Sequence, residues 1–265
     1  MLKTYLKGLL MGTADLVPGV SGGTIALITG IYDELIKSIT ELTYIPQQIL
    51  KKDFSFFKTT NYKLLIPLFL GIITAIFLGA RIISYLLLNY PGFTYSFFIG
   101  LIIASVYFLA KPLVDKVNAT IGIITGTIIG IILSFLVLNI QVTGIIGTFF
   151  LGFFAITAMI LPGISGSYIL LILGQYEYAI NLVKNLPTTW FMTLIFMLGC
   201  LIGLLALSRL INYLIKKHSD ITHGVLVGLM FGTLIVPLRL VFETNPSWII
   251  LAFILAGIST IKLMK

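Results

Sequence analysis

Residues 12–36 read GTADLVPGVSGGTIALITGIYDELI, and residues 156–180 read ITAMILPGISGSYILLILGQYEYAI. The two stretches align without a gap at an offset of 144 residues, and 12 of their 25 positions are identical. Each is an apolar run that is broken by Pro-Gly and continues after a Ser-Gly turn. Hydrocarbon cannot satisfy the backbone groups that a helix break exposes, so each break should line protein or a water-filled cavity. Two such breaks in corresponding halves are typical of a transporter binding site.

The composition places the chain among integral membrane proteins. Of its 265 residues, 58% are hydrophobic and 10% are charged, and the mean hydropathy is +1.11. About 25% of the residues in a soluble domain are charged. A single cysteine, Cys200, excludes an intramolecular disulfide and a cysteine-based zinc site. Asp15 interrupts the first apolar run and no small-residue cleavage site follows it, so we expect the N-terminus to be retained.

Apolar segments divide the chain into two units, each a broken hairpin followed by three crossings. The first repeat, 1–140, contains a hairpin (1–42), a polar loop (43–62) and spans near 64–88, 93–110 and 118–138. The second repeat, 141–265, contains a hairpin (144–183) and spans near 190–214, 222–238 and 248–263. Hairpin arms of roughly 14 to 18 residues are short for a crossing, which needs about 20 residues, so they favour a re-entrant hairpin.

An inverted internal repeat explains these two units. An offset of 128 residues aligns the crossings and pairs Arg81 with Arg209 and Gly100 with Gly228. Three crossings per unit would turn the second repeat upside down. With the N-terminus in the cytoplasm, 13 of the 17 basic residues fall on the inside and two, Lys184 and Arg239, fall outside. This bias is typical of cytoplasmic loops and predicts that both termini are cytoplasmic. We therefore read the basic residues as a topology signal and not as a nucleic-acid surface.

The two turns are the first candidates for binding. A half-helix should begin just after each break, with free backbone N–H groups and the positive end of its dipole in the membrane interior. Such a helix start binds phosphate or carboxylate readily. The candidate residues are Ser21, Gly22, Gly23, Thr24, Ser165, Gly166 and Ser167, with Pro18, Gly19, Pro162 and Gly163 as hinges. In the alternative interpretation, the serines only cap their own helices and the glycines allow close packing.

Two intramembrane arginines are the next candidates. Arg81 and Arg209 occupy equivalent positions within their spans. A charged side chain at the centre of a span costs on the order of 2.5–3.5 kcal/mol, so it normally has a partner or a wet cavity. The functional interpretation is a bidentate clamp on an anionic head group. The alternative is that each side chain extends to the nearer interface.

Four acidic residues are candidates for coupling transport to a proton or a sodium ion. Asp15 lies near the tip of the first hairpin, where an acidic residue is expensive; its alternative role is a local hydrogen bond to N–H groups that the break frees. Asp33, Glu34 and Glu177 lie at the far ends of the second arms, where they could also anchor the hairpins at the interface or pair with an arginine. We predict no metal and no bound cofactor.

Enzyme signatures are absent from the sequence. The two histidines, His218 and His223, form no H-E-x-x-H motif. No Walker lysine follows either glycine turn, and no G-x-S-x-G elbow occurs. We therefore predict no catalytic residue. An intramembrane enzyme is the weakest of the alternatives that we consider.

The first motif resembles the signature of a known family. The run from Gly12 to Thr24, continuing to Tyr32, is similar to that of the PopT-type polyprenyl-phosphate transporters, bacterial proteins formerly grouped as a domain of unknown function. The likeness covers essentially the whole chain, including the weaker second copy from Leu161 to Gly166. It implies transport of undecaprenyl phosphate, the carrier lipid of cell-wall polymers, from the outer to the inner leaflet of the bacterial cytoplasmic membrane. It implies no residue roles beyond the motif.

Two alternatives from other classes remain at this point. One is an ion-coupled transporter of a small soluble anion, which a lateral opening wide enough for a lipid tail would count against. The other is a non-transporting assembly partner of envelope enzymes, which activity of the purified protein in liposomes would dismiss. The sequence predicts no oligomeric state.

Overall fold

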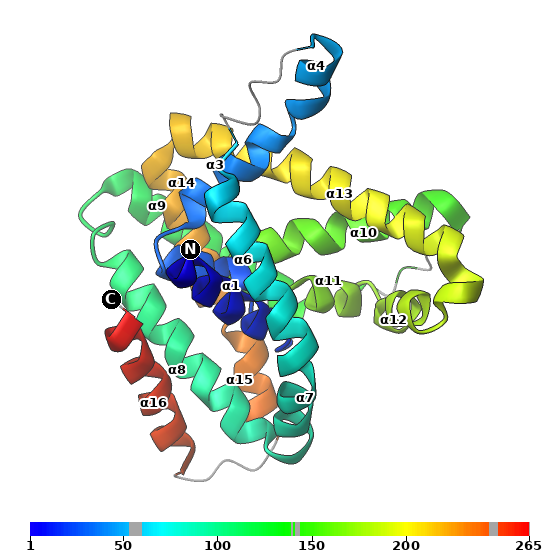
Figure 1. The fold of residues 1–265 in the computed structure, drawn as a ribbon. Helices are drawn as coiled ribbons and strands as arrows, with labels where there is room; N and C mark the ends of the chain where they lie inside the picture. The colour runs from blue at the N-terminus through cyan, green and yellow to red at the C-terminus, as the bar shows by residue number, and fades with distance from the viewer. Residues whose placement is uncertain (53–59, 139, 141–143, 244–248, 265) are drawn as a thin grey trace.

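The computed structural model describes residues 1–52, 60–138, 140, 144–243 and 249–264, and every regular element in this part of the chain is a helix (Figure 1). The first half consists of α1 (Leu2–Asp15), α2 (Gly22–Ile28), α3 (Tyr32–Leu42), α4 (Ile45–Leu50), α6 (Tyr62–Thr74), the π-helical turn η1 (Ala75–Gly79), α7 (Ala80–Asn89), α8 (Pro91–Ala110) and α9 (Val117–Phe135). The second half consists of α10 (Gly144–Ile160), α11 (Gly166–Ile172), α12 (Tyr176–Lys184), α13 (Leu186–Lys217), α14 (Ser219–Gly232), α15 (Ile235–Phe242) and α16 (Ile249–Met264).

Five helical stretches are long and apolar enough to cross a membrane: Tyr62–Asn89, Pro91–Ala110, Val117–Phe135, Leu186–Lys217 and Ser219–Phe242. They coincide with five of the six predicted spans, which confirms the all-helical, multi-pass class. The sixth predicted span overlaps α16, whose apolar stretch Leu251–Thr260 is shorter. The predicted polar loop 43–62 contains a short helix, α4, and its residues 53–59 lie outside the described part of the chain.

Both predicted helix breaks are present. α1 ends at Asp15 and α2 begins at Gly22, while α10 ends at Ile160 and α11 begins at Gly166. The glycine of each Pro-Gly pair has a positive φ, 82° at Gly19 and 86° at Gly163, in a region that side chains other than glycine rarely adopt. The Pro-Gly pair therefore ends the first arm and turns the chain towards the second.

Each second arm is broken again, which the sequence analysis did not predict. α2 and α11 are seven residues long and end at glycines with φ values of 70° (Gly30) and 68° (Gly174). At the first of these ends, Gly30 N donates to Leu27 O and Ile31 N donates to Ala26 O, and the second end repeats this pattern. These are the two hydrogen bonds of a Schellman cap, which needs a left-handed residue at that position. The identical glycines of the repeat therefore stop two short helices.

Helices pair both within each half, as α1 with α6 and α10 with α13, and between the halves, as α9 with α14 and α8 with α16. Small residues permit this closeness, because a Cβ built on Gly126 would lie 2.2 Å from Val225 O and one built on Gly228 would lie 2.2 Å from Ile123 O. Glycine at helix contacts is typical of membrane bundles.

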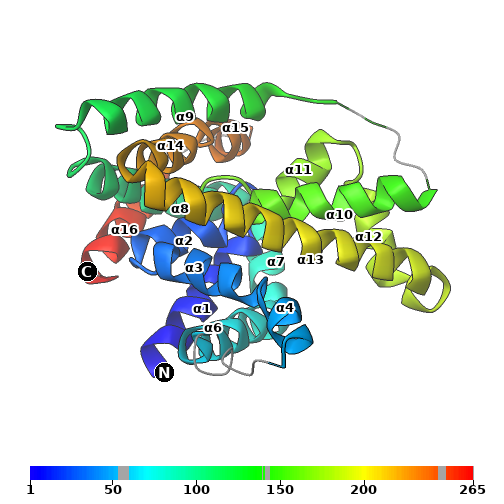
Figure 2. The same ribbon diagram turned by 90° about the horizontal axis from the view of Figure 1, so that it is seen from above.

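The two hairpins differ in their surroundings. α1, α2 and α3 lie within the bundle, whereas α10, α11 and α12 project to one side together with the first part of α13 (Figures 1 and 2). The largest buried apolar cluster includes Val17, Val20 and Ile36 of the first hairpin. The second hairpin thus leaves more of its surface exposed than the first.

Candidate functional site at the two hairpin turns

The two turns contact each other directly. Gly19 N of the first turn donates to Ser165 Oγ of the second at 3.2 Å, and Gly163 N of the second donates to Thr24 Oγ1 of the first at 2.9 Å. Ser21 Oγ lies 3.1 Å from two carbonyl oxygens at the end of α10, those of Met159 and Leu161. Residues about 140 positions apart therefore form one polar cluster, and three of its hydroxyl-bearing side chains, Ser21, Thr24 and Ser165, are buried.

Each turn starts a short helix at the predicted residue. Ser21 is the N-cap of α2 and its Oγ accepts from Gly23 N at 3.1 Å. Ser165 is the N-cap of α11 and its Oγ accepts from Tyr168 N at 3.2 Å. Serine caps of this kind satisfy an N–H group that the helix leaves free. The capping role that we weighed as the alternative is thus present at both turns.

The first turn contains its own acidic acceptor. Asp15 Oδ1 accepts from Gly22 N at 2.7 Å, across the break from the end of α1 to the start of α2. Gly23 N donates to the Ser21 side chain and Thr24 N donates to Ser21 O. The first three N–H groups of α2 are therefore all bonded within the protein, and a carboxylate occupies the place where the helix dipole would favour an anion.

The second turn lacks this carboxylate. Met159 is the counterpart of Asp15, and a Cβ built on Gly166 would lie 3.8 Å from Met159 Cβ. In the described part of the chain, the N–H groups of Gly166 and Ser167 have no acceptor. Ser167 Oγ lies 3.1 Å from Ser165 Oγ, and Gly166 and Ser167 are half-buried. Two backbone donors and a hydroxyl at a helix start can bind an anion.

The two arginines differ in their contacts. Arg209 Nε donates to Thr43 Oγ1 at 2.6 Å and Nη2 donates to Thr43 O at 3.2 Å, and its guanidinium lies 5.1 Å from the centroid of the Tyr44 ring. Arg81 is exposed and makes no hydrogen bond or ion pair with any residue that the structure describes. Neither guanidinium bonds to a turn residue, so the structure does not bring the predicted clamp together with the turns.

The acidic candidates at the far ends of the second arms also differ. The Asp33 carboxylate lies 3.1 Å from His223 Nε2 of α14, and Glu34 Oε1 accepts from Asn61 Nδ2 at 2.6 Å. Glu177 is exposed and has no such partner among the described residues. No group of three or more His, Cys, Asp and Glu side chains that could hold a metal occurs in this part of the chain.

A third arginine, counted only as an outside charge in the sequence, lies close to the second hairpin. The Arg239 guanidinium is 4.3 Å from the centroid of the Phe135 ring at the end of α9. Tyr168 of α11 donates its hydroxyl to carbonyl oxygens of that same helix end, at 3.1 Å from Ser134 O. Spacing alone offered no signal for this cluster, because it joins α9, α11 and α15.

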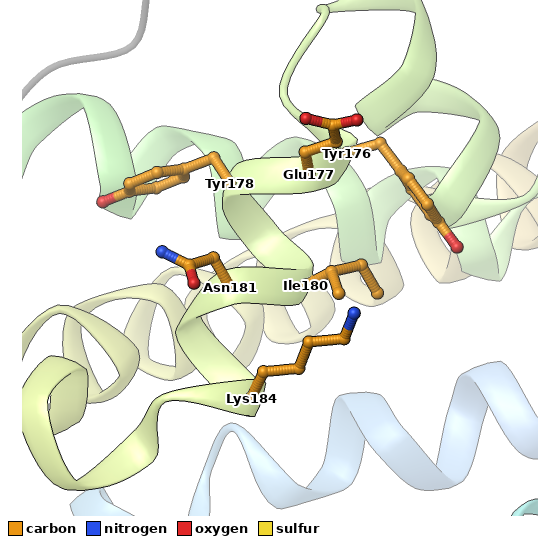
Figure 3. A pocket seen from close by; sticks show the side chains of 6 residues that line it. All are labelled: Tyr176, Glu177, Tyr178, Ile180, Asn181 and Lys184. Carbon is orange, nitrogen blue, oxygen red and sulfur yellow. The ribbon is translucent and has the colours of Figure 1, made fainter.

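A cavity of about 550 Å³ lies along α12, beyond the second turn. Its lining side chains, shown in Figure 3, all belong to α12: Tyr176, Glu177, Tyr178, Ile180, Asn181 and Lys184. Two phenols, a carboxyl group, an amide, an ammonium group and an apolar side chain thus line one open cavity on this helix.

Comparisons with known proteins agree with the motif resemblance. The model of the undecaprenyl phosphate translocase-like family matches residues 11–247. A polyprenyl-phosphate transporter of Vibrio cholerae serotype O1 is 44% identical over 237 residues, which cover 88% of this chain and 76% of that protein. A polyprenyl-phosphate transporter of Staphylococcus aureus is 34% identical over 266 residues, covering 94% of this chain and 89% of that protein. No solved structure matches the chain significantly.

Proposed function

Because this chain belongs to the undecaprenyl phosphate translocase-like family, we propose that it carries undecaprenyl phosphate across the bacterial cytoplasmic membrane. The two relatives named polyprenyl-phosphate transporter support this substrate class. In our proposal, the protein returns the lipid from the outer to the inner leaflet, where it serves cell-wall polymer synthesis again. The direction of transport follows from the family resemblance and not from any contact in the fold.

The second turn carries the proposal. The phosphate head must cross hydrocarbon, where an unpaired charge is costly, while the polyprenyl tail can remain in lipid. The N–H groups of Gly166 and Ser167 have no acceptor in the described part of the chain, and the Ser167 hydroxyl lies 3.1 Å from Ser165 Oγ. These groups stand at the start of a helix and suit a phosphate oxygen. We propose that these groups bind the phosphate, and that Ser21, Thr24 and Ser165 hold the two turns together around it.

The first turn provides a means of coupling. The Asp15 carboxylate holds Gly22 N–H in the present state. A proton or a sodium ion on Asp15 would weaken this hydrogen bond and release the Gly22 donor for the phosphate. We propose this residue as the coupling site, ahead of Asp33, Glu34 and Glu177, because it alone contacts a turn.

The arginines would receive the head group before it reaches the turns. Arg81, which is exposed and unpaired in the described part of the chain, suits this role better than Arg209, which Thr43 and Tyr44 already engage. Under the inverted topology, with re-entrant hairpins and both termini in the cytoplasm, Arg81 lies towards the outer leaflet and Arg209 towards the inner one. The matching order of α1–α2–α3 and α10–α11–α12 supports the internal repeat from which that topology is inferred.

A reconstitution experiment tests the proposal. Purified protein in liposomes should make undecaprenyl phosphate of the inner leaflet accessible from outside faster than protein-free liposomes do, and undecaprenol without phosphate should gain nothing. Arg81→Gln should slow the exchange more than Arg209→Gln. Folded protein that exchanges no undecaprenyl phosphate, but takes up a small soluble anion such as inorganic phosphate, would replace this proposal with the soluble-anion transporter.

A further inference from the structure

The second arms of the two hairpins match in sequence but not in burial. Tyr32 and Ile36 of α3 are 2% and 1% exposed. Their counterparts at the offset of 144 residues are the same residue types, Tyr176 and Ile180 of α12, which are half-buried and line the open cavity (Figure 3). The helix face that carries these two residues is thus buried in α3 and partly exposed in α12.

Contacts with the opposite half cover α3. The helix packs against α13, and Arg209 of α13 donates two hydrogen bonds to Thr43, the residue that follows α3. Asp33 at the start of α3 bonds to His223 of α14. We call this set the α3 contacts: Asp33–His223 and Arg209–Thr43.

No equivalent set holds α12 among the described residues. α12 packs against α11 and α13, which belong to its own half. The counterpart of Arg209 is Arg81, which has no bonding partner there, and the counterpart of Asp33 is Glu177, which has none either. Of the four residues that make the α3 contacts, Arg209 and Asp33 therefore recur in the repeat as an arginine and an acidic residue that are unpaired among the described residues.

A π-helical turn distinguishes the helix that carries Arg81 from the matching helix that carries Arg209. η1 (Ala75–Gly79) interrupts the first span directly before α7, which carries Arg81 as its second residue. The matching segment of α13, 203–207, continues as regular α-helix up to Arg209. Single π turns inside α-helices are frequent at functional sites and are one of the few causes of sharp kinks.

From these differences we propose that the protein has a second state in which α12 closes against α7 and α8 of the first half. In that state Arg81 contacts the residues that follow α12, Pro187 and Thr188, which are the counterparts of Thr43 and Tyr44. The α3 contacts are broken at the same time, so the two hairpins exchange environments. The cavity along α12 is the space that the first half of this chain then fills.

This exchange of environments explains how the proposed transport could occur, and its biological purpose rests on that proposed function. Two states in which opposite hairpins close would expose the turns first to one side and then to the other. Repeats in many transporters rock against each other around a fixed central site. A ligand or a substitution shifts such an equilibrium only through contacts that differ between the two states. Here those contacts are the Arg209 and Arg81 pairs.

Thiol labelling of the two matched positions tests the exchange. In a Cys200→Ser background, which removes the native thiol, a single cysteine is placed by Ile36→Cys or Ile180→Cys, and its labelling rate by a maleimide is measured in purified protein in nanodiscs. Arg209→Gln should raise labelling at position 36 and lower it at position 180 by about tenfold, which corresponds to about 1.4 kcal/mol. Arg81→Gln should move both rates in the opposite direction. Lys217→Gln, which changes another exposed α13 cation, should move neither.

Cross-linking gives a second readout if a cysteine at position 36 prevents folding. The pair Thr43→Cys/Arg209→Cys should react with a short bifunctional thiol reagent, and so should the matched pair Pro187→Cys/Arg81→Cys. Cross-linking of the first pair but not of the second would refute the proposed second state. A labelling rate at position 180 that is unchanged by Arg209→Gln would refute it as well. Neither assay contains substrate. A protein that exchanges hairpins but moves no undecaprenyl phosphate would therefore refute the proposed function and leave this inference intact.

Discussion

The first and second hairpin turns start from the same sequence pattern and end with opposite hydrogen-bonding states. Both break at Pro-Gly and both start a seven-residue helix at a serine cap. At the first turn Asp15 accepts from Gly22 N, whereas at the second Met159 leaves Gly166 N without an acceptor in the described part of the chain. One substitution in the repeat thus separates a turn whose first helical N–H group bonds to an acidic side chain from a turn whose first helical N–H group is available to a ligand.

The same comparison distinguishes the residues that hold the two turns together from the residues that are accessible to a ligand. Ser21 and Thr24 are fully buried and bond to the second hairpin, while Gly166 and Ser167 are half-buried. A buried group with all its hydrogen bonds made stabilises the contact between the two turns, because removing it would leave its buried partner unsatisfied at a cost in folding free energy. An accessible donor contributes little to folding and can exchange water for a ligand. Substitutions at matched positions should therefore affect stability at the first turn more than at the second.

The largest effect on stability is expected at the matched positions 23 and 167, where one copy of the repeat has glycine and the other has serine. Gly23 is the counterpart of Ser167, and a Cβ on Gly23 would lie 2.5 Å from Ile160 O, closer than real contacts allow. Gly23→Ser should lower the free energy of unfolding by about 3 kcal/mol through overpacking. The matched change, Ser167→Gly, should cost far less. Thermal unfolding in detergent measures both, and equal melting temperatures would show that the turns do not pack as described.

A smaller loss is expected from Thr24→Val. The Thr24 hydroxyl accepts from Gly163 N in a buried position, so valine keeps the shape and leaves the N–H group unsatisfied. The expected cost is about 2 kcal/mol of unfolding free energy. Thr24→Ser keeps the hydroxyl and serves as the control. If valine and serine gave the same melting temperature, the hydrogen bond between the two turns would contribute nothing measurable.

The smallest effect should be the same in both hairpins. Gly30 and Gly174 have φ values of 70° and 68°, and a Cβ on Gly30 would meet no atom within 4 Å. Gly30→Ala should cost about 1 kcal/mol from backbone strain alone, and Gly174→Ala, at nearly the same φ, should carry the same strain. Differential scanning fluorimetry of the two variants checks this equality. A much larger loss at either position would mean that the two Schellman caps are not equivalent.

Much of this fold could be predicted from residue patterns. Pro-Gly in an apolar run predicted both breaks, and Ser21 and Ser165 predicted both helix starts, because these signals are local. Five of the six predicted spans coincide with helices long enough to cross a membrane. The second break of each arm was missed although Gly30 and Gly174 are identical in the repeat. An isolated glycine in an apolar pattern predicts a cap less clearly than Pro-Gly does.

The candidate site was predicted less completely, for a physical reason. Asp15 was considered as a coupling residue or as a local hydrogen-bond acceptor, and the structure shows the hydrogen bond without testing the coupling. The contacts of Arg209 with Thr43 and of Arg239 with Phe135 join residues that are 166 and 104 positions apart. Such pairs depend on how the helices pack, and no spacing rule within one segment reports them.

The central claim, that the second turn binds the phosphate because it lacks a carboxylate, is tested most directly by Met159→Asp. This variant copies the first turn and places a carboxylate opposite Gly166, while Met159→Asn adds a polar group without the charge. The measurement is the exchange of undecaprenyl phosphate in proteoliposomes, with folding of each variant checked by thermal unfolding. We predict that folded Met159→Asp loses most of the exchange and that Met159→Asn retains more of it. Exchange by Met159→Asp at the rate of the unchanged protein would contradict the claim and place the phosphate elsewhere.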